Sequence, residues 1–426
     1  MTTVTKHLVT ALAGAMSLAG LMAVTPALRA AQTAPLNLRL QTIESPASAG
    51  GSSIPQVTVS SRGVLLSWIE RAGKVATLKF AERTATGWTS AQVAASGDNW
   101  FVNWADVPSV LRLTNGTLVA HWLQKNGGGP ESYDVRLSTS SDNGKTWGEP
   151  FSSHHDGTKT EHGFVSMLQM PGGGLGMIWL DGRASAPMTG NMTGMDHGGS
   201  MSLRFAAFDT KFKQMADVLI DGRVCDCCPT TVAVTADGPI AAFRNRSDDE
   251  IRDIYVARME NGKWTEPKAA HDDGWKINAC PVNGPALSAR GRDVAIAWFT
   301  GKDNQNRTFG AFSKDAGRTF GEPIALDDGK PLGRVDIEML SDGSALATWI
   351  ESTAKGSEFR ARRIEPSGRR SDAMTVAEIP AARTSGHPRV AMSGTELVFA
   401  WTEAVPGQVA GTDGALRVKT AVMRVQ

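Results

Sequence analysis

Leu65-Leu66-Ser67-Trp68 is a short apolar run that ends in an aromatic residue, and the chain repeats this pattern along its length. The intervals between successive aromatic residues are 54, 57, 64, 55, 51 and 52 residues. A nearly constant period of this size indicates a repeat architecture. The seven positions are Trp68, Trp122, Trp179, Phe243, Trp298, Trp349 and Trp401.

Each repeat contains further runs with the alternation of β-strands. A strand and a glycine-containing turn precede the aromatic residue, and a third strand follows it, as at residues 133–138, 203–208 and 254–258. Four strands in each of seven repeats, with no convincing amphipathic helix, predict an all-β chain folded as a seven-bladed β-propeller. Six blades is the alternative, because the first or last repeat could be irregular.

The two ends of the repeat region complement each other. The seventh repeat stops at its third strand, residues 417–424, and a spare strand stands before the first repeat at residues 36–41. We therefore expect the spare strand to complete the last blade and close the ring. We therefore predict a single propeller domain over residues 36–426.

The first thirty residues have the pattern of a secretory signal. Lys6 and His7 precede a mostly apolar run at residues 8–24, and small residues follow it around Ala27. An uncleaved membrane anchor is the alternative, because the run is near the lower length limit for a span. We expect an exported protein, periplasmic or secreted, that is free of the membrane after cleavage. The formal net charge of +1 gives no reason to expect nucleic acid as a partner.

Two turns carry a recognisable motif. Ser141-Asp142-Asn143-Gly144-Lys145-Thr146-Trp147 matches Ser-x-Asp-x-Gly-x-Thr-Trp with its spacing shortened by one residue, and residues 313–320 match it with Phe320 in place of Trp. These turns resemble the Asp-box of the sialidase-like propellers, which are built from bacterial neuraminidase repeats (BNR). The resemblance covers most of the mature chain and implies the propeller fold. It implies no activity, because the motif is structural.

Strand order predicts which loops share a face. The loops that lead into each blade and the loops between second and third strands leave an antiparallel blade on the same side. All four cysteines and six of the seven histidines beyond His7 lie in these loops. Loops on a rigid scaffold commonly carry function. The histidines are His154, His155, His162, His197, His271 and His387.

One of these loops is rich in soft metal ligands. Residues 188–201 contain four methionines and one histidine, and they resemble the methionine- and histidine-rich tracts of exported copper-handling proteins. Thioether and imidazole groups suit Cu(I). A polar loop in which the methionines are incidental is the alternative. The residues are Met188, Met192, Met195, His197 and Met201.

The cysteines form a second candidate site. Cys225, Cys227 and Cys228 lie within four positions, and Cys280 follows one repeat later. Two disulfides are the simplest use of four cysteines in an exported protein, with Cys227 or Cys228 paired to Cys280. A thiolate cluster for a soft metal is the alternative. The spacing does not fit a standard zinc knuckle, so copper is favoured if a metal is bound.

Three arginines form a third candidate site. Arg183, Arg244 and Arg246 stand at the ends of second strands and could clamp a carboxylate of a substrate. A network of salt bridges between blades is the alternative.

The family resemblance would also imply a tyrosine nucleophile paired with a glutamate. Tyr133 and Tyr255 are the only tyrosines, and both are expected in the middle of third strands, away from the mouth. Glu161 or Asp106 could serve as an acid, but the sequence shows no pairing.

The sequence therefore leaves three functions open. The first is non-hydrolytic binding of a soft metal, copper above all, by the methionine-rich loop and the cysteines. The second is an exo-sialidase type of glycoside hydrolase that takes a glycan or other small molecule. The third is a non-catalytic scaffold stabilised by disulfides.

Overall fold

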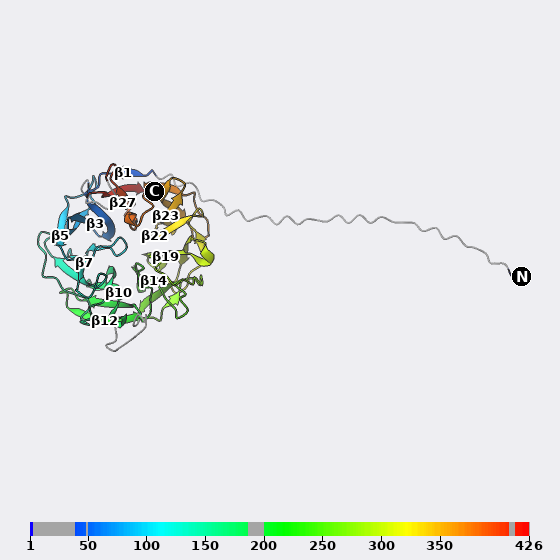
Figure 1. Cartoon of the computed structure of the whole chain (residues 1–426), viewed down its shortest axis with the longest axis horizontal. Coiled ribbons are helices and arrows are strands. Elements are labelled where there is room, and N and C mark those ends of the chain that lie inside the picture. Colours follow the sequence, from blue (N-terminus) through cyan, green and yellow to red (C-terminus); the bar gives the residue numbers. More distant parts are fainter. Residues whose placement is uncertain (3–38, 48–49, 186–199, 409–413, 426) are drawn as a thin grey trace.

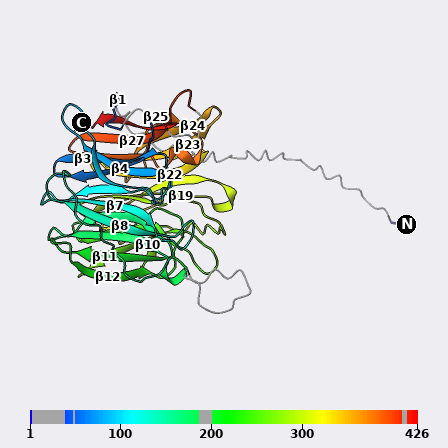
Figure 2. The same cartoon turned by 60° about the vertical axis from the view of Figure 1, so that its left-hand side comes forward.

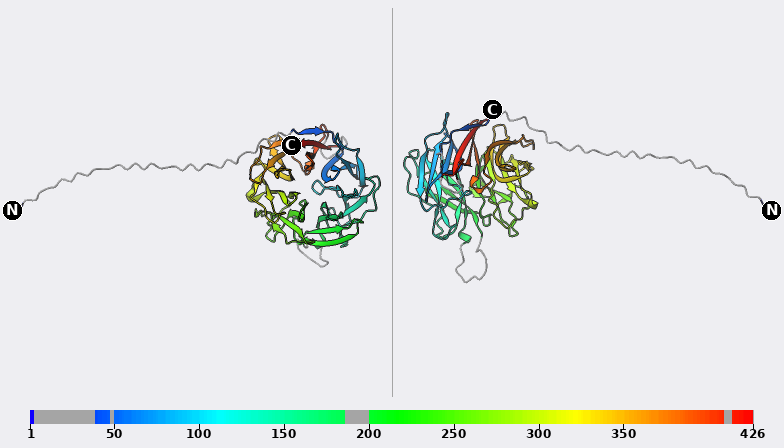
Figure 3. Two further views of the ribbon diagram at one scale, coloured as in Figure 1. Left: turned by 180° about the vertical axis from the view of Figure 1, so that it is seen from behind. Right: turned by 45° about the horizontal axis from the view of Figure 1, so that its top comes forward.

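The fold is that of a computed structural model, which describes residues 1–2, 39–47, 50–185, 200–408 and 414–425. Seven antiparallel sheets stand around a common axis, and the ring is visible from both of its ends (Figures 1 and 3). Each sheet packs one face against the sheet beside it, and we call the sheets blades (Figure 2). The predicted all-β, seven-bladed propeller is confirmed, and the six-bladed alternative is wrong.

The blades follow each other along the chain, and the innermost strand comes first in each. Blade 1 contains β2 (Ser52–Ser60), β3 (Gly63–Ala72), β4 (Val75–Glu82) and β5 (Gln92–Gly97). Blade 2 contains β6 (Ser109–Arg112), β7 (Leu118–Lys125) and β8 (Tyr133–Ser140). Blade 3 contains β9 (His162–Gln169), β10 (Leu175–Asp181), β11 (Ser202–Phe208) and β12 (Gln214–Asp221). Blade 4 contains β13 (Thr231–Thr235), β14 (Gly238–Arg244), β15 (Ile254–Glu260), β16 (Lys263–Trp264) and β17 (Lys268–Ala269).

The remaining blades complete the ring. Blade 5 contains β18 (Ala286–Arg290), β19 (Asp293–Thr300), β20 (Arg307–Ser313) and β21 (Ile324–Ala325). Blade 6 contains β22 (Pro331–Met339), β23 (Ala345–Thr353), β24 (Gly356–Ile364) and β25 (Met374–Ile379). Blade 7 contains β26 (Arg389–Ser393), β27 (Glu396–Ala404) and β28 (Leu416–Arg424). Three short 3-10 helices lie in loops: η1 (Arg183–Ser185), η2 (Lys302–Asn304) and η3 (Arg383–Ser385).

The N-terminal part of the chain supplies the outer strand of blade 7. Strand β1 (Gln41–Ile43) pairs antiparallel with β28, and Gln41 stands opposite Val422. Ring closure by an N-terminal strand is therefore confirmed. Its position is corrected, because the strand begins at Gln41, Arg39 and Leu40 are not in a strand, and residues 36–38 lie outside the described residues.

The repeated aromatic residues stand in the cores of the blades, and four of the tryptophans bury the ring while the indole N–H bonds a carboxylate. Trp68, Trp179, Trp298 and Trp349 are almost fully buried. In three of them the donor bonds a carboxylate two residues further along the same strand, as in Trp179 Nε1 to Asp181 Oδ2 at 2.8 Å. Trp298 instead bonds Asp273 at 2.8 Å. A buried tryptophan needs such a partner for its N–H.

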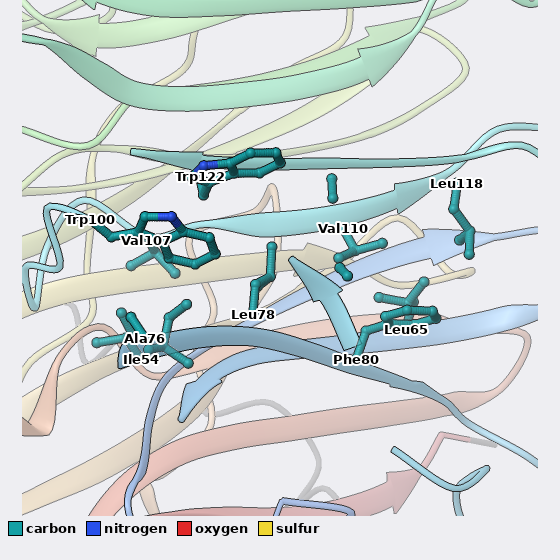
Figure 4. Packing of buried hydrophobic residues seen from close by; sticks show 13 residues of the cluster. Ile54, Leu65, Ala76, Leu78, Phe80, Trp100, Val107, Val110, Leu118 and Trp122 are labelled. Atoms are coloured by element: carbon teal, nitrogen blue, oxygen red, sulfur yellow. The ribbon is translucent and has the colours of Figure 1, made fainter. Parts of the chain in front are cut away.

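Neighbouring blades are joined largely by apolar packing, with a few hydrogen bonds between them, such as Thr58 Oγ1 to the carbonyl of Val110 at 2.8 Å. Leu65, Leu78 and Phe80 of blade 1 pack against Val110 and Trp122 of blade 2 (Figure 4). Trp100 stacks on Trp122 with ring centroids 5.5 Å apart. Each blade buries its apolar faces only by packing against both neighbours. A closed ring therefore leaves no apolar face of a blade exposed to water.

The two aspartate turns have the same hydrogen bonds. Asp142 accepts bonds from the backbone N–H and the hydroxyl of Thr146 at 2.9 and 2.7 Å, and Asp315 accepts the matching bonds from Thr319. The serine of the first turn is Ser140, whose Oγ bonds Asp142 at 2.8 Å and accepts from the N–H of Gly144. The shortened spacing inferred from Ser141 was therefore wrong, since Ser140 restores the full spacing.

The loops that lead into blades 4 and 5 share a face with the loops after second strands, as predicted. The N–H of Val224 donates to the carbonyl of Met201 at 2.9 Å, which joins the segment before blade 4 to the end of the β10–β11 loop. The N–H of Arg252 donates to the carbonyl of Trp275 at 2.9 Å, which joins the β14–β15 loop to the segment before blade 5. We call this end of the ring the mouth face.

Candidate metal centre

The three clustered cysteines lie in the segment that leads from β12 into β13. Val224 forms an isolated β-bridge with Asn245, and the N–H of Cys225 donates to the carbonyl of Arg244 at 2.9 Å. These bonds fix the segment against the end of β14. The Sγ atoms of Cys225 and Cys228 are 3.3 Å apart, and those of Cys225 and Cys227 are 3.9 Å apart.

All three sulfur atoms lie within 4.8 Å of one another, so a single ion could contact all of them. Cys225 and Cys228 are buried, Cys227 is half-buried and Cys280 is exposed. All four cysteines are free thiols in the structure, so neither of the two disulfides considered from the sequence is seen. The cluster is closed toward the core and open toward the mouth face at Cys227.

Cationic groups surround the buried thiol of Cys225. Arg252 donates from Nη1 to Cys225 Sγ at 3.3 Å and is itself held by Glu250 at 2.7 Å. Hydrogen bonds from the Cys227 and Cys228 thiols, together with the nearby charge of Arg244, hold the pKa of Cys225 well below its usual value although burial opposes this. Burial raises the pKa of Cys228. Among the three clustered cysteines, Cys225 is thus the one whose surroundings favour the thiolate form.

Cys280 stands at the edge of the same cluster. A hydrogen bond with the Cys227 thiol lowers the pKa of Cys280 although burial opposes it. The contact joins the segment before blade 5 to the segment before blade 4. The structure thus brings the four cysteines together, as the repeat spacing predicts.

The methionine-rich loop is described only at its end. Met188, Met192, Met195 and His197 lie outside the described residues. Met201 is described and is 5% exposed, within the apolar core of blades 3 and 4. Because its backbone carbonyl accepts the N–H of Val224, the loop ends next to the cysteine segment.

The three arginines predicted as a substrate clamp all have protein partners. Arg183 forms a bidentate pair with Asp181 at 2.7 and 2.8 Å, and Arg246 pairs with Glu250 at 2.7 Å. Arg244 is 1% exposed and donates to three backbone carbonyls, those of Asn283, Arg252 and Phe299. Contacts of this kind position loops and join blades 4 and 5.

A polar triad at the boundary of blades 2 and 3 was missed by the sequence reasoning. The hydroxyl group of Tyr133 is 2.9 Å from Asp106 Oδ2 and 2.7 Å from Glu161 Oε1. Tyr133 lies on the third strand of blade 2 as expected, at the start of β8 and not in its middle. Residues 133 and 161 form a parallel bridge between consecutive blades, which no pattern in the sequence indicates.

Protonation of this triad follows from its burial. Burial raises the pKa of Asp106 to about 7 and that of Glu161 to about 8, and it raises that of Tyr133 well above its usual value. The tyrosine has one hydroxyl proton, so one of the two contacts has a protonated carboxyl group as its donor. Phe101 stacks on the Tyr133 ring at 4.1 Å, and Tyr133 is fully buried.

The inner strands of all seven blades line a central cavity of about 630 Å³. Asp106, Asp336, Glu338 and Arg389 are among its charged lining residues. Burial raises the pKa of Glu338 to about 8, and Ser288 donates to its carboxyl group at 2.9 Å. Burial thus raises the pKa of two lining carboxyl groups, Asp106 and Glu338, toward or above neutral pH.

Three tryptophans in the loops that lead into the blades have structural contacts. Trp100 stacks on Trp122, and Trp275 packs against Phe299 and under the guanidinium group of Arg244 at 4.9 Å. Trp104 is more exposed than the other two. It lies half-buried, stacked on His387 and against the guanidinium group of Arg334.

Comparison with known proteins gives the fold and leaves the activity open. No family model matches the sequence, and no curated protein matches it significantly. The polysaccharide lyase Uly1 is similar in structure with a TM-score of 0.50, at 11% identity over 93% of this chain and 94% of the lyase. A NanB sialidase structure from Streptococcus pneumoniae has a TM-score of 0.46 at 9% identity, over 91% of this chain and 93% of that chain.

AofleA from Arthrobotrys oligospora has a TM-score of 0.44 at 10% identity, over 80% of this chain and 90% of that chain. At such low identity the likeness to the lyase shows a common propeller architecture alone. Among the described residues, no helix is both long and apolar enough to cross a membrane.

Proposed function

We propose that this chain is an exported seven-bladed propeller that binds Cu(I), without hydrolytic activity, through the thiolates of Cys225, Cys227 and Cys228. One observation carries the proposal. Three sulfur atoms from one short segment lie within 4.8 Å of one another, and none of them is in a disulfide. Thiolates are the protein ligands that most favour Cu(I) and other soft ions.

The surroundings of the cluster support a low-charge ion. Three thiolates carry three negative charges, and a monovalent ion leaves two of them uncompensated. Arg252, which contacts Cys225 Sγ and is 3% exposed, supplies a buried positive charge at the cluster. Arg244 adds a second positive charge close to Cys225. Buried charges persist only where such partners are present.

Further ligands are proposed from the two neighbouring segments. Cys280 contacts Cys227 and offers a fourth thiolate at the exposed side of the cluster. Met188, Met192, Met195, His197 and Met201 belong to the loop that ends beside Val224, and we assign the loop the capture of the ion before its transfer to the thiolates. Met201 stands at the base of this loop.

Copper binding is tested on the purified, reduced mature protein. Cu(I) is titrated against a chromophoric Cu(I) chelator without oxygen, and we expect one ion per chain with sulfur as the nearest neighbour in X-ray absorption. Cys225→Ser and Cys228→Ser should each lower the affinity at least tenfold, because each removes one of three ligands. Met215→Leu, at an exposed methionine of β12, is the matched control and should not change it.

The contradicting result is equally specific. If the natural chain is folded by circular dichroism and leaves all Cu(I) with the chelator, the cluster is not a copper site. If all four cysteines of the exported protein are in disulfides and none is a free thiol, the result favours the scaffold function. Replacement of Met188, Met192, Met195 and His197 together should slow Cu(I) uptake and leave the final stoichiometry unchanged.

Export is tested separately, by sequencing the N-terminus of the protein after expression in a bacterial host. Cleavage after a residue between Ala27 and Ala31 would support it, and an intact Met1 would contradict it.

A glycoside hydrolase of the sialidase type is the second candidate, and the triad of Tyr133, Asp106 and Glu161 favours it. A tyrosine hydroxyl group next to a glutamate is the arrangement that the family resemblance implies for the nucleophile. Against this, the ring of Tyr133 is fully buried under Phe101, and the arginines 183, 244 and 246 are held by protein groups. The structure therefore supports it less than metal binding.

The hydrolase is tested with a fluorogenic sialoside. Release of the fluorophore by the natural chain, and its loss in Tyr133→Phe with an unchanged melting temperature, would establish it. Activity that persists in Tyr133→Phe would assign the signal to a contaminant.

A further inference from the structure

A second group of metal-ligating side chains lies between blades 2 and 3, outside the cysteine cluster. His154 and Asp156 stand in the segment that leads from β8 into β9, and His162 is the first residue of β9. Asp181 is the last residue of β10 and stands opposite His162 in the ladder. The register of two adjacent strands and the preceding loop thus bring these four side chains together on the mouth face.

Both imidazole rings are buried, and three of their four nitrogen atoms lack hydrogen-bond partners. The side chain of His162 is 0% exposed and neither of its ring nitrogens has a hydrogen-bond partner, and the same holds for Nε2 of His154. The carboxylate atom Asp156 Oδ2 is buried and lacks a partner as well. Buried polar atoms without partners are rare in folded proteins, and a bound ion or water is the usual explanation.

The carboxylate atom Asp156 Oδ2 lies close to one nitrogen of each ring. Asp156 Oδ2 is 3.2 Å from His162 Nε2 and 3.3 Å from His154 Nδ1, while Asp181 Oδ2 is 3.8 Å from His162 Nε2. In a tetrahedral zinc site with bonds of about 2.1 Å, neighbouring ligand atoms stand about 3.4 Å apart. The observed separations are close to this spacing.

The carboxylates are held in place by other groups. The N–H of Thr158 donates to Asp156 Oδ1 at 2.9 Å, which leaves Oδ2 directed at the histidines. Arg183 chelates Asp181 and stands 3.6 Å from Asp156 Oδ2. The bond to Asp156 Oδ1 is of the kind that orients the ligands of metal sites, whereas Asp181 Oδ2 already accepts from Arg183 Nη2 and Trp179 Nε1, each at 2.8 Å.

We propose that His154 Nδ1, His162 Nε2 and Asp156 Oδ2 bind a divalent transition-metal ion of the Zn²⁺ class. Imidazole and carboxylate ligands suit such an ion and do not suit Cu(I). The site is therefore distinct from the thiol cluster and does not depend on copper binding there.

Binding requires a small movement of the two histidines. Their rings are parallel within 3° with centroids 3.8 Å apart, so the lone pairs run side by side and do not converge. One ion reaches both nitrogens only when the rings tilt apart. The stacking contact is then lost, and the change is visible in the histidine resonances.

The experiment uses the mature chain with all four cysteines replaced by serine, which excludes the thiol cluster. Co²⁺ is the optical probe, because a four-coordinate nitrogen and oxygen site gives ligand-field bands without thiolate charge transfer. We expect one Co²⁺ per chain, displaced by Zn²⁺. His154→Gln and Asp156→Asn should each lower the Co²⁺ affinity at least tenfold, and His155→Gln, at the exposed neighbour, should not.

Two results would overturn the proposal. One is a folded cysteine-free chain that takes up no Co²⁺, and the other is uptake that persists unchanged in His154→Gln and Asp156→Asn. If the cysteine-free chain does not fold, Zn²⁺ is added to the natural chain and the histidine ring resonances are followed by NMR. Shifts of the His154 and His162 ring resonances with His155 unmoved support the site, and no shift of either ring contradicts it. Neither readout depends on whether the thiols bind copper.

Discussion

Replacing Arg244 by methionine should destabilise the propeller. The side chain is 1% exposed, and its guanidinium group donates to the carbonyls of Asn283 at 2.9 Å and Phe299 at 2.7 Å, as well as to that of Arg252. These three carbonyls belong to the β14–β15 loop, to β19 and to the segment before β18. Arg244 is therefore a cross-link between blades 4 and 5.

The magnitude follows from the three lost bonds. A buried carbonyl left without a partner costs about 1–3 kcal/mol, so three cost about 3–9 kcal/mol. Removing the guanidinium group also removes the penalty of burying its charge, which offsets several kcal/mol. Methionine fills part of the space, so the cavity contribution is small. We expect the free energy of unfolding to fall by about 3–5 kcal/mol.

The measurement is urea unfolding followed by tryptophan fluorescence, with Arg246→Met as the matched control. Arg246 is 22% exposed in its pair with Glu250, and its loss should change the free energy of unfolding by about 1 kcal/mol or less. The reasoning is refuted if Arg244→Met unfolds within about 0.5 kcal/mol of the natural chain. Lost binding of a sugar acid at unchanged stability would instead make Arg244 a ligand-binding residue.

Three further predictions concern the aspartate turn, the central cavity and the triad. Ser140→Ala should lower the free energy of unfolding by about 1 kcal/mol, because Ser140 bonds Asp142 and Gly144. Ser141→Ala should leave it unchanged. Thermal unfolding measures both variants, and equal effects would contradict the assignment of Ser140 to the turn. Glu338 has a folded pKa of about 8 against 4.5 unfolded, so between these values the folded chain holds the extra proton and stability falls as pH rises. Glu338 should lower the free energy of unfolding by at most about 1.4 kcal/mol per pH unit in this range, and water in the cavity reduces the effect. Glu338→Gln should remove this dependence on pH. If the dependence of stability on pH is the same in the variant, Glu338 is ionised in the folded chain. Gly163→Ala should destabilise by about 2 kcal/mol or more, because its Cβ would stand 2.0 Å from Asp106 Oδ2, while Gly87→Ala meets nothing within 4 Å and should be neutral by the same assay.

Local patterns in the sequence were enough for the blade and for the number of blades. A tryptophan at the end of an apolar strand, as in Trp68 and Trp179, predicts a buried second strand wherever it recurs. The expected third strands at residues 133–138 and 254–258 lie within β8 and β15. Strand order also placed the cysteines on one face, because the direction of an antiparallel loop depends on connectivity alone.

Contacts between blades could not be derived from the sequence. Tyr133 meets Asp106 and Glu161 only because adjacent blades pack at a given height and angle. The stacking of His154 on His162 likewise depends on how a loop returns across the end of β10. Periodicity carries no information about these distances.

The sequence by itself determined an all-β ring of seven repeats with the cysteines gathered on one face, because strand alternation, turn residues and repeat length are local and additive along the chain. Only the tertiary structure decided that three thiols share one site, that Arg244 bonds backbone carbonyls, and that two buried histidines face a carboxylate. Those arrangements depend on the angle and register between neighbouring blades, which arise when the whole ring packs and closes.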